Sequence, residues 1–442
     1  MPSSIHPLLA ELNRPHLVHD NVLPFIRELK KIESVEVVCE GESYEGRDIY
    51  RIRLGCGPIV ILAWTQMHGN EATATASVFD LIDSVLSAQD MPLNVFEQLF
   101  TLHIVPMLNP DGAQRCIRHN AQAIDINRDA MAQQTPEGRI LMRLVDDLKP
   151  KVGFNLHDQS PYYQCGTNGN PSTIAFLAPA FNHEKDIDEA RFLAMALIGK
   201  MTETISPHIP QCIARYDDTF SPRSFGDRIA ERQVSTILIE SGAARKDPNR
   251  QVARKMNVLA IRSALNALKD MHEQQLDEAQ LSHYQQAYWR IHENTAETLS
   301  SLVIHNLRFD GEHPYFASIS IKQTARYSDV FFIDAVGDLG IQAGLEEFDA
   351  TGLCFDYGRP HNLSEPLLID NQGYKDWLKK GVIHFHGEAD LLNNQSDYSL
   401  SFNNTEPSIR CSLRLQQPAY FLMRLKGVVV AAVINGKLLI LE

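Results

Sequence analysis

Residues 58–71 read Pro-Ile-Val-Ile-Leu-Ala-Trp-Thr-Gln-Met-His-Gly-Asn-Glu, an apolar run that ends in a polar turn. A run of this length, rich in β-branched residues and without polar alternation, predicts a strand buried on both faces. After the turn, apolar residues recur at helical spacing from Val78 to Leu86, which predicts a helix with one buried face. The stretch therefore predicts the strand–turn–helix unit of an α/β fold.

Three further apolar runs of strand length follow, at residues 99–105, 152–156 and 234–239. Helical patterns lie between them, and after the last run Asp247 and Pro248 predict a helix start with the aspartate as its cap. Strands that alternate with helices in this way predict a mixed, mostly parallel sheet flanked by helices.

Beyond residue 300 the pattern changes to short strand-like pieces separated by turn-forming pairs such as Asn435-Gly436. These pieces lie at residues 331–335, 381–385, 411–415 and 428–434. We therefore predict two domains: an α/β domain over residues 1–300 and a smaller β-rich accessory domain over residues 301–442. The accessory domain could pack on the first domain, cover its cleft, or join two copies of the chain in a homo-oligomer.

Composition limits the classes of partner. With 44% hydrophobic and 22% charged residues, the 442-residue chain can bury a sizeable core. The formal net charge of −14 argues against a nucleic-acid binder, which needs a basic face, and against a polybasic membrane contact. No apolar run approaches the ~20 residues that span a bilayer. We expect neither a nucleic-acid nor a membrane partner.

The N-terminal residues and the cysteines favour a cytoplasmic location. The N-terminal residues lack a basic segment, and Pro7 and Glu11 interrupt their apolar stretch, so they do not resemble a signal peptide. Seven cysteines are scattered without paired spacing, which is typical of reduced thiols in the cytoplasm.

Three residues could share one metal ion. His68 and Glu71 are three apart in a turn after a strand, and His157 ends another apolar strand, where open α/β sheets bind ligands. Together they form the His₂Glu set of a catalytic zinc, which leaves a position for water. Taken singly, each has an ordinary alternative: a surface His–Glu pair, or a hydrogen-bonded core histidine.

Polar residues elsewhere could act beside such a metal. Glu240 ends the fourth apolar strand, where it could be a general base or simply a capping or salt-bridged glutamate. Arg118 and Arg128 lie ten residues apart near Asn127, and could bind a carboxylate and polarise a carbonyl. The alternative is that both are ordinary surface arginines.

The ordered set of motifs resembles the zinc metallocarboxypeptidases of the carboxypeptidase A type, in a bacterial-like cytoplasmic form with a C-terminal β domain. The matches are Gly41-Glu-Ser-Tyr-Glu-Gly-Arg47, His68-x-x-Glu71, Asn109-Pro-Asp-Gly112, the Arg118 segment, Asp125-x-Asn127-Arg128, His157 and Glu240. The resemblance implies one zinc ion held by His68, Glu71 and His157.

The same resemblance implies roles for the remaining residues. Glu240 would be the general base and later the acid, while Arg118 would polarise the scissile carbonyl. Asn127 and Arg128 would bind the terminal carboxylate of the substrate. Tyr216, 24 residues before Glu240, is the candidate for the tyrosine that closes over the substrate.

Three positions depart from the family pattern. Asp129 stands where many relatives have Asn, Ala123 where Gly is common, and Asp158 where Ser is frequent. An acidic group beside the metal could favour cationic substrate ends, or could orient a histidine ligand. The sequence leaves both alternatives open.

Three functions remain in competition. The first is a metallocarboxypeptidase that removes a C-terminal residue from a peptide, or acts on a small amide with a free carboxylate, through zinc-activated water and Glu240. The second is an amidohydrolase of the same fold acting on N-acyl amino acids or cell-wall peptides. The third is a non-catalytic zinc-binding or peptide-binding module. In the accessory domain, His384 and His386 could bind a metal or belong to an ordinary packed strand.

Overall fold

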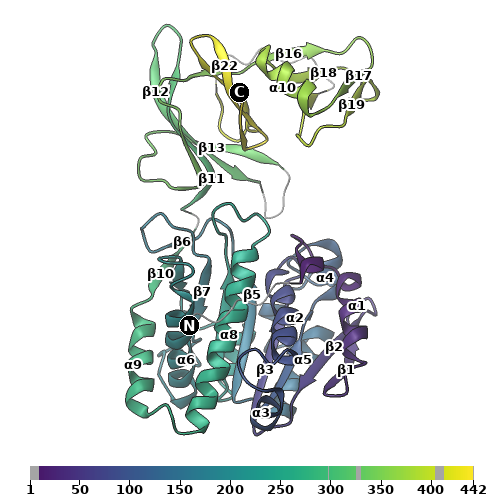
Figure 1. Ribbon diagram of the computed structural model, residues 1–442, viewed down its shortest axis with the longest axis vertical. Coiled ribbons are helices and arrows are strands. Elements are labelled where there is room, and N and C mark those ends of the chain that lie inside the picture. The colour runs from purple at the N-terminus through teal and green to yellow at the C-terminus, as the bar shows by residue number, and fades with distance from the viewer. Residues whose placement is uncertain (1–8, 297, 325–329, 404–412, 442) are drawn as a thin grey trace. The chain divides into compact units, whose positions relative to one another are not determined.

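The computed structural model describes residues 9–296, 298–324, 330–403 and 413–441 (Figure 1). The chain divides into two compact units, Met1–Ala296 and Glu297–Glu442. The boundary that we predicted between residues 300 and 301 falls inside strand β11 (Ser300–Phe309).

The first unit is built on a ten-stranded sheet with the order β1-β2-β4-β3-β5-β9-β7-β8-β10-β6. Its strands are β1 (Val35–Glu42), β2 (Asp48–Leu54), β3 (Ile59–Thr65), β4 (Phe100–Val105), β5 (Val152–Asp158), β6 (Gln164–Cys165), β7 (Ile174–Leu177), β8 (Ile213–Arg215), β9 (Ser235–Ser241) and β10 (His292–Thr295). The central strands β4, β3, β5 and β9 run parallel, whereas β2 and β7 pair antiparallel with β4 and β9. The predicted mixed, mostly parallel sheet is confirmed, and its four predicted strands are the central ones.

Helices cover both faces of this sheet (Figure 1). They are α1 (His19–Leu29), α2 (Thr73–Leu86), α3 (Leu93–Leu99), α4 (Pro110–Arg115), α5 (Pro136–Leu148), α6 (Glu189–Ile205), α7 (Phe225–Ala230), α8 (Gln251–His272) and α9 (Glu278–Trp289), with single 3₁₀ turns at Ala10–Leu12 and Ile126–Arg128. On β3, Ile61 and Ala63 belong to the core formed with α2, α6 and α8, while Leu62 and Trp64 belong to the core formed with α5 and α7. This alternation explains why residues 59–64 of the strand are apolar on both faces.

The predicted start of α8 is wrong by a few residues. The helix begins at Gln251, and Arg250, in the left-handed conformation with φ of 54°, stands at its N-terminus. Asp247 nevertheless caps it, because its carboxylate accepts hydrogen bonds from the backbone N–H groups of Gln251 (2.9 Å) and Val252 (2.6 Å). Asp247 thus caps the helix although it lies four residues before Gln251 in the chain.

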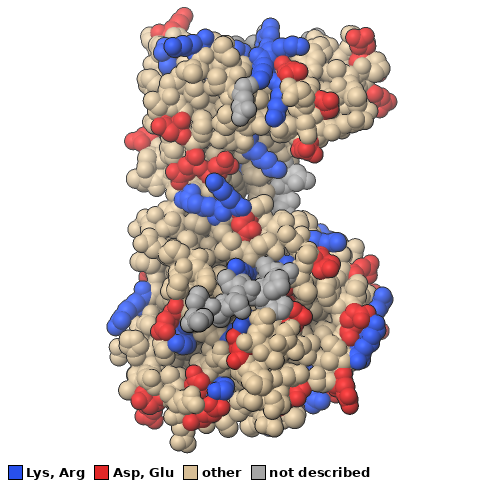
Figure 2. Space-filling model, viewed as in Figure 1, with Lys and Arg blue, Asp and Glu red and all other residues tan. Residues whose placement is uncertain are grey.

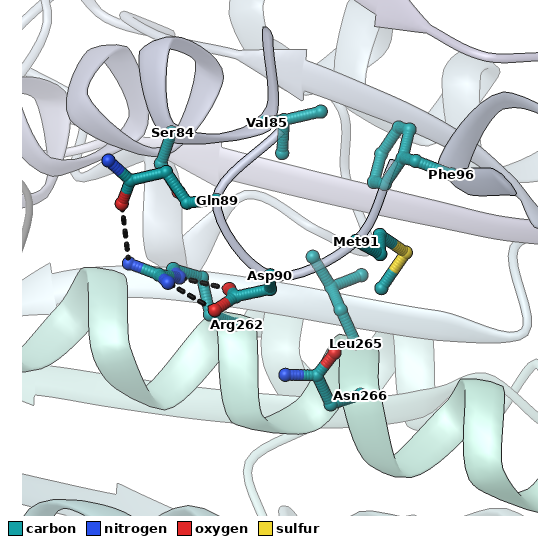
Figure 3. A pocket seen from close by; sticks show the side chains of 9 residues that line it. All are labelled: Ser84, Val85, Gln89, Asp90, Met91, Phe96, Arg262, Leu265 and Asn266. Carbon is teal, nitrogen blue, oxygen red and sulfur yellow. Dashed lines mark hydrogen bonds and ion pairs between the residues drawn. The ribbon is translucent and has the colours of Figure 1, made fainter. Parts of the chain in front are cut away.

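A small cavity lies where the loop between α2 and α3 meets α8 (Figure 3). Arg262 of α8 holds this loop through a forked ion pair with Asp90, and its Nη1 donates to Gln89. The cavity measures about 20 Å³. That is room for about one water molecule, so the cavity is a packing feature and not a substrate site.

The second unit is β-rich, as predicted. Its main sheet has the order β13-β12-β11-β15-β21-β22-β23, with β14 paired to β11, and two small sheets, β16-β18-β20 and β17-β19, accompany α10 (Asn371–Lys379). The remaining strands are β12 (Tyr315–Gln323), β13 (Phe331–Gly337), β14 (Gly344–Asp349), β15 (Cys354–Asp356), β16 (Arg359–Asn362), β17 (Leu367–Ile369), β18 (Val382–His386), β19 (Leu392–Asn394), β20 (Ser401–Asn403), β21 (Tyr420–Leu425), β22 (Val428–Ile434) and β23 (Lys437–Ile440).

Three of the four strands predicted in this unit correspond to β13, β18 and β22. The fourth, at residues 411–415, lies partly outside the described residues, and residues 413–415 form no strand.

Two general expectations can be compared with the described part of the chain. None of its helices combines the length and apolar character needed to cross a bilayer. Six of the seven cysteines lie in this part, and all six are free thiols. On the face that Figure 2 shows, acidic and basic side chains of the first unit are interspersed.

Candidate metal centre

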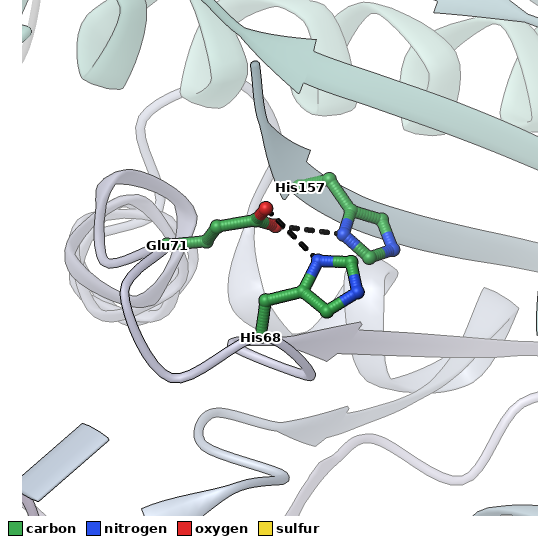
Figure 4. A group of neighbouring side chains, drawn as sticks. All are labelled: His68, Glu71 and His157. Atoms are coloured by element: carbon green, nitrogen blue, oxygen red, sulfur yellow. Dashed lines mark hydrogen bonds and ion pairs between the residues drawn. The ribbon is translucent and has the colours of Figure 1, made fainter. Parts of the chain in front are cut away.

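Two neighbouring strands bring His68, Glu71 and His157 together. His68 and Glu71 lie in the turn between β3 and α2, and His157 lies near the end of β5, which pairs with β3 in parallel. His68 Nδ1 is 2.9 Å from Glu71 Oε1, and His157 Nδ1 is 2.7 Å from Glu71 Oε2 (Figure 4). All three side chains are buried. The predicted ligand set therefore converges on one point.

The turn that carries two of these residues is held tightly. The backbone N–H of Glu71 donates to the His68 carbonyl (3.1 Å), and Asn109 Nδ2 donates to the Met67 carbonyl (3.1 Å). Gly69 packs against α4 so closely that a Cβ atom there would lie 1.9 Å from the Gly112 carbonyl carbon. Only glycine fits, and this contact fixes the turn against the Asn109-Pro-Asp-Gly112 segment.

The donor atoms suit zinc. One nitrogen from each imidazole and one carboxylate oxygen lie within 4.8 Å of one another, and this is the one such group within the described residues. Two nitrogens and a carboxylate oxygen are the protein ligands of many catalytic zinc sites, which keep a further position open. Both Nδ1 atoms face Glu71, so the same atoms that meet here could face a cation.

Asp125 supports the centre, although we did not predict it as a site residue. Its Oδ1 lies 3.1 Å from His68 Nε2, and its Oδ2 accepts a hydrogen bond from Arg118 Nε (3.0 Å). A carboxylate on the far nitrogen of a histidine ligand orients the ring and raises its basicity. The signal was present in the sequence, since Asp125 belongs to the Asp-x-Asn-Arg motif.

The charged groups of the centre shift one another's pKa values. Burial by itself would lower the pKa of His68, but the carboxylates of Glu71 and Asp125 outweigh it and raise that pKa. Burial would raise the pKa of Glu71, yet the two histidines hold it well below its usual range. Arg118 adds positive charge, because its Nη1 lies 3.2 Å from His68 Nδ1 and 3.8 Å from Glu71 Oε1. The histidines and the carboxylates therefore stabilise each other's charged forms, whereas Arg118 opposes the protonation of His68.

Glu240 lies on the strand next to the histidine ligand. In the parallel pairing of β5 with β9, His157 and Glu240 are register partners. Partners in register project to the same face of a sheet, so Glu240 lies beside the centre without belonging to the ligand group. Burial, followed by the negative charge of Glu240, raises the pKa of Tyr216, and Glu71 contributes as well. Tyr216 therefore shares the electrostatic environment of both carboxylates.

Asn127 is linked to the centre by a hydrogen bond to Asp125, and Arg128 is the next residue in the chain. The Asn127 N–H donates to Asp125 Oδ1 (3.0 Å), the atom that lies 3.1 Å from His68 Nε2, so the two nitrogens are at most 6.1 Å apart (3.0 + 3.1). Arg128 follows directly and contacts none of the three ligands; its Nη1 donates to the Asn127 carbonyl (2.7 Å) and to Ser224 Oγ (3.2 Å). Arg128 is exposed to solvent.

The three departures from the family pattern have local explanations. Asp158 Oδ2 accepts hydrogen bonds from the Thr73 N–H (3.3 Å) and Oγ1 (2.9 Å) at the start of α2, which favours a positioning role over a substrate contact. Asp129 accepts three hydrogen bonds from residues that lead into α5. Ala123 has φ of 61°, in the left-handed region where glycine is favoured.

Arg250 joins the two strand ends that carry His157 and Glu240. Its guanidinium, in a residue only 7% exposed, donates to the carbonyl of Ser241 (2.5 Å) and to that of Gln159 (2.8 Å). These carbonyls lie one residue after Glu240 and two residues after His157. One buried cation therefore fixes both strand ends relative to each other.

Arg250→Ala is expected to lower the free energy of unfolding by roughly 2–4 kcal/mol, because two buried carbonyl oxygens lose charged donors. Urea unfolding followed by tryptophan fluorescence would measure the loss. The matched control is Arg139→Ala, since exposed Arg139 also donates to two carbonyls, those of Gln133 (3.0 Å) and Gln134 (2.9 Å). The control should change stability by less than ~0.5 kcal/mol. Equal losses in the two variants would contradict the role of Arg250.

The histidine pair of the second unit does not form a comparable group. His384 Nδ1 lies 2.8 Å from Ser401 Oγ on the neighbouring strand β20. Neither His384 nor His386 meets two further ligand residues within the described part of the chain. The ordinary packed-strand alternative is therefore favoured for this pair.

Part of the chain is similar in sequence to known zinc carboxypeptidases. A family model described as zinc carboxypeptidase matches residues 24–139, a segment that contains His68, Glu71 and the Arg118–Arg128 region. A zinc carboxypeptidase of Simulium vittatum is 29% identical over 82 residues, which are 18% of this chain and 27% of that protein. The chain thus spans about a quarter of the length of this curated relative.

Solved structures that match part of the chain include two carboxypeptidases. The metallo-carboxypeptidase of Burkholderia cenocepacia has a TM-score of 0.49 and 16% identity, and the match covers 58% of this chain and 70% of that one. The carboxypeptidase A of Helicoverpa armigera has a TM-score of 0.45 and 17% identity, with 58% and 75% covered.

Proposed function

We propose, from the match of residues 24–139 to a family model described as zinc carboxypeptidase, that the chain is a zinc-dependent metallocarboxypeptidase that removes the C-terminal residue of a peptide. The observation that carries the proposal is the convergence of His68, Glu71 and His157, with Glu240 in register on the adjacent strand. A hydrolytic centre of this kind needs three ligands, an open position and a base beside it.

Zinc held by His68, Glu71 and His157 would supply a Lewis acid for the attacking water and the scissile carbonyl. Glu240 would accept a proton from the water as it attacks and return that proton to the leaving amine. The Arg118 guanidinium lies 3.2 Å from a ligand nitrogen, close enough to stabilise negative charge as it develops on the carbonyl oxygen. The pairing of Arg118 with Asp125 pre-organises it for this task.

The substrate would be bound by its free C-terminus. Asn127 and Arg128 would hold the terminal carboxylate, since an arginine fork matches a carboxylate in two hydrogen bonds. Tyr216 would close over the bound residue. Its partial burial and its stacking against Tyr163, with ring centroids 6.2 Å apart, support a place at the wall of the site.

The proposal is tested by incubating the zinc-loaded protein with N-blocked dipeptides, N-acyl amino acids and cell-wall peptides. Release of the C-terminal amino acid from blocked dipeptides would support a carboxypeptidase. Cleavage of N-acyl amino acids or cell-wall peptides alone would identify an amidohydrolase of the same fold. Zinc bound without cleavage of any substrate would refute an enzymatic role.

Arg128→Ala is expected to lower kcat/KM for free-acid peptides by ~10–100-fold, because a charge-assisted hydrogen bond to the terminal carboxylate is lost. Peptides with an amidated C-terminus lack that carboxylate, so any slow cleavage of them should change little. The comparison of the two substrate series in wild type and variant measures the effect. Equal losses on both series would remove Arg128 from carboxylate binding.

A further inference from the structure

Arg128 has a second arginine beside it. Arg223 Nε donates to the Arg128 carbonyl (3.3 Å), and the Ala130 N–H donates to the Arg223 carbonyl (3.2 Å). Two more hydrogen bonds join the same segments, from the Phe225 N–H to Asn127 Oδ1 (2.9 Å) and from Arg128 Nη1 to Ser224 Oγ (3.2 Å). Four contacts therefore fix residues 127–130 and 223–225 side by side, with both arginines exposed.

Neither guanidinium has an anionic partner. No carboxylate of the described residues lies within 4.0 Å of the Arg128 or Arg223 side chain, whereas Arg118 pairs with Asp125 and Arg228 pairs with Glu231. Two adjoining cations repel each other, and in a chain with a formal charge of −14 their isolation from carboxylates needs a reason. A ligand that brings its own negative charges would supply one.

The charge of Arg128 acts on one nearby acid, Asp227, but that carboxyl group already accepts a hydrogen bond from the backbone. Asp227 Oδ2 accepts a hydrogen bond from the Ser221 N–H (2.5 Å), and its side chain is buried. Burial raises the pKa of Asp227 to about 7, so near neutral pH this group carries only part of a negative charge. Asp227 therefore leaves most of the positive charge of the two arginines available at the surface.

Resting on the proposed function, we infer that Arg223 determines specificity for an acidic C-terminal residue, by binding the side-chain carboxylate of Glu or Asp while Arg128 binds its α-carboxylate. A C-terminal Glu or Asp carries two carboxylates on a short aliphatic link, which matches two guanidiniums on adjoining segments. The backbone that carries Arg128 also runs near the centre, since the nitrogen of the preceding Asn127 is within 6.1 Å of His68 Nε2 (3.0 + 3.1).

The decisive comparison uses peptides that end in Glu or in Gln, which have the same shape and differ in charge. Wild-type kcat/KM is expected to be ~10–100-fold higher for the Glu peptide, the range of a charge-assisted hydrogen bond. In Arg223→Gln the ratio should fall to about one, through loss on the Glu peptide alone, and Arg223→Lys should restore part of it. Arg228→Gln is the control, because this arginine of the same region is neutralised by Glu231 and should leave the ratio unchanged.

A wild-type ratio near one, or a ratio that survives in Arg223→Gln, would overturn the inference while peptide cleavage itself upheld the proposed function. If no peptide is cleaved, the proposed function fails, and the anion site is tested by calorimetry with glutarate and butyrate. Tighter binding of glutarate that is lost in Arg223→Gln would still support a two-carboxylate site. Equal binding of both acids would overturn it.

Discussion

Glu240→Gln is expected to lower the rate of peptide hydrolysis by ~10²–10⁴-fold and to leave the zinc content unchanged. Glutamine keeps the shape of the side chain but cannot accept a proton from water near neutral pH. Zinc should remain, because Glu240 stands in register with His157 and is outside the three-residue ligand group. Steady-state kinetics and elemental analysis of the same preparation measure both quantities.

The control for this variant is Glu293→Gln on β10, since the Glu293 side chain is 84% exposed and lies 3.9 Å from its cationic partner Arg215. It should retain full activity. Turnover close to wild type in Glu240→Gln would remove the general-base role. Loss of zinc together with activity would mean that Glu240 shapes the centre and does not act in the proton transfer.

Glu71→Ala is expected to weaken zinc binding by more than ~10²-fold and to abolish hydrolysis. Changes to residues that only support a metal ligand already weaken binding by ~10–100-fold, and Glu71 contributes an oxygen to each of the two imidazole contacts. Two histidines alone would leave zinc with half of a tetrahedral set. Competition with a fluorescent zinc chelator measures the affinity.

Glu137→Ala is the matched control, because Glu137 is a second fully buried glutamate of the same unit and its carboxylate accepts a hydrogen bond from Asn120 (3.1 Å). Any loss of stability from deleting a buried glutamate should appear in both variants, but only Glu71→Ala should lose zinc. Zinc binding that survives in Glu71→Ala would show that the ion is held elsewhere. Zinc loss in both variants would indicate general unfolding.

Three features of the site could not be read from the sequence, because each depends on contacts between distant segments. The sequence did not decide whether Asp158 contacts the substrate or positions other residues, because its hydrogen-bond partner, Thr73, lies 85 residues away in the chain. Arg250 gave no signal at all, since donation to two backbone carbonyls requires no particular residue type at the receiving positions. The unpartnered state of Arg223 is likewise invisible in a sequence, because it depends on where every carboxylate lies.

The sequence by itself determined the central sheet and the ligand types. The continuous apolar run at residues 58–64 and the mainly apolar run at residues 152–156 are stable only when both faces of a strand are covered, so the buried parallel strands followed from local composition. The identities of His68, Glu71 and His157 followed from the chemistry that zinc accepts. Only the tertiary structure decided the distances among them, the support from Asp125 and the pairing of Arg128 with Arg223. Those features are contacts between segments far apart in the chain, and their geometry is set by packing, not by any local pattern.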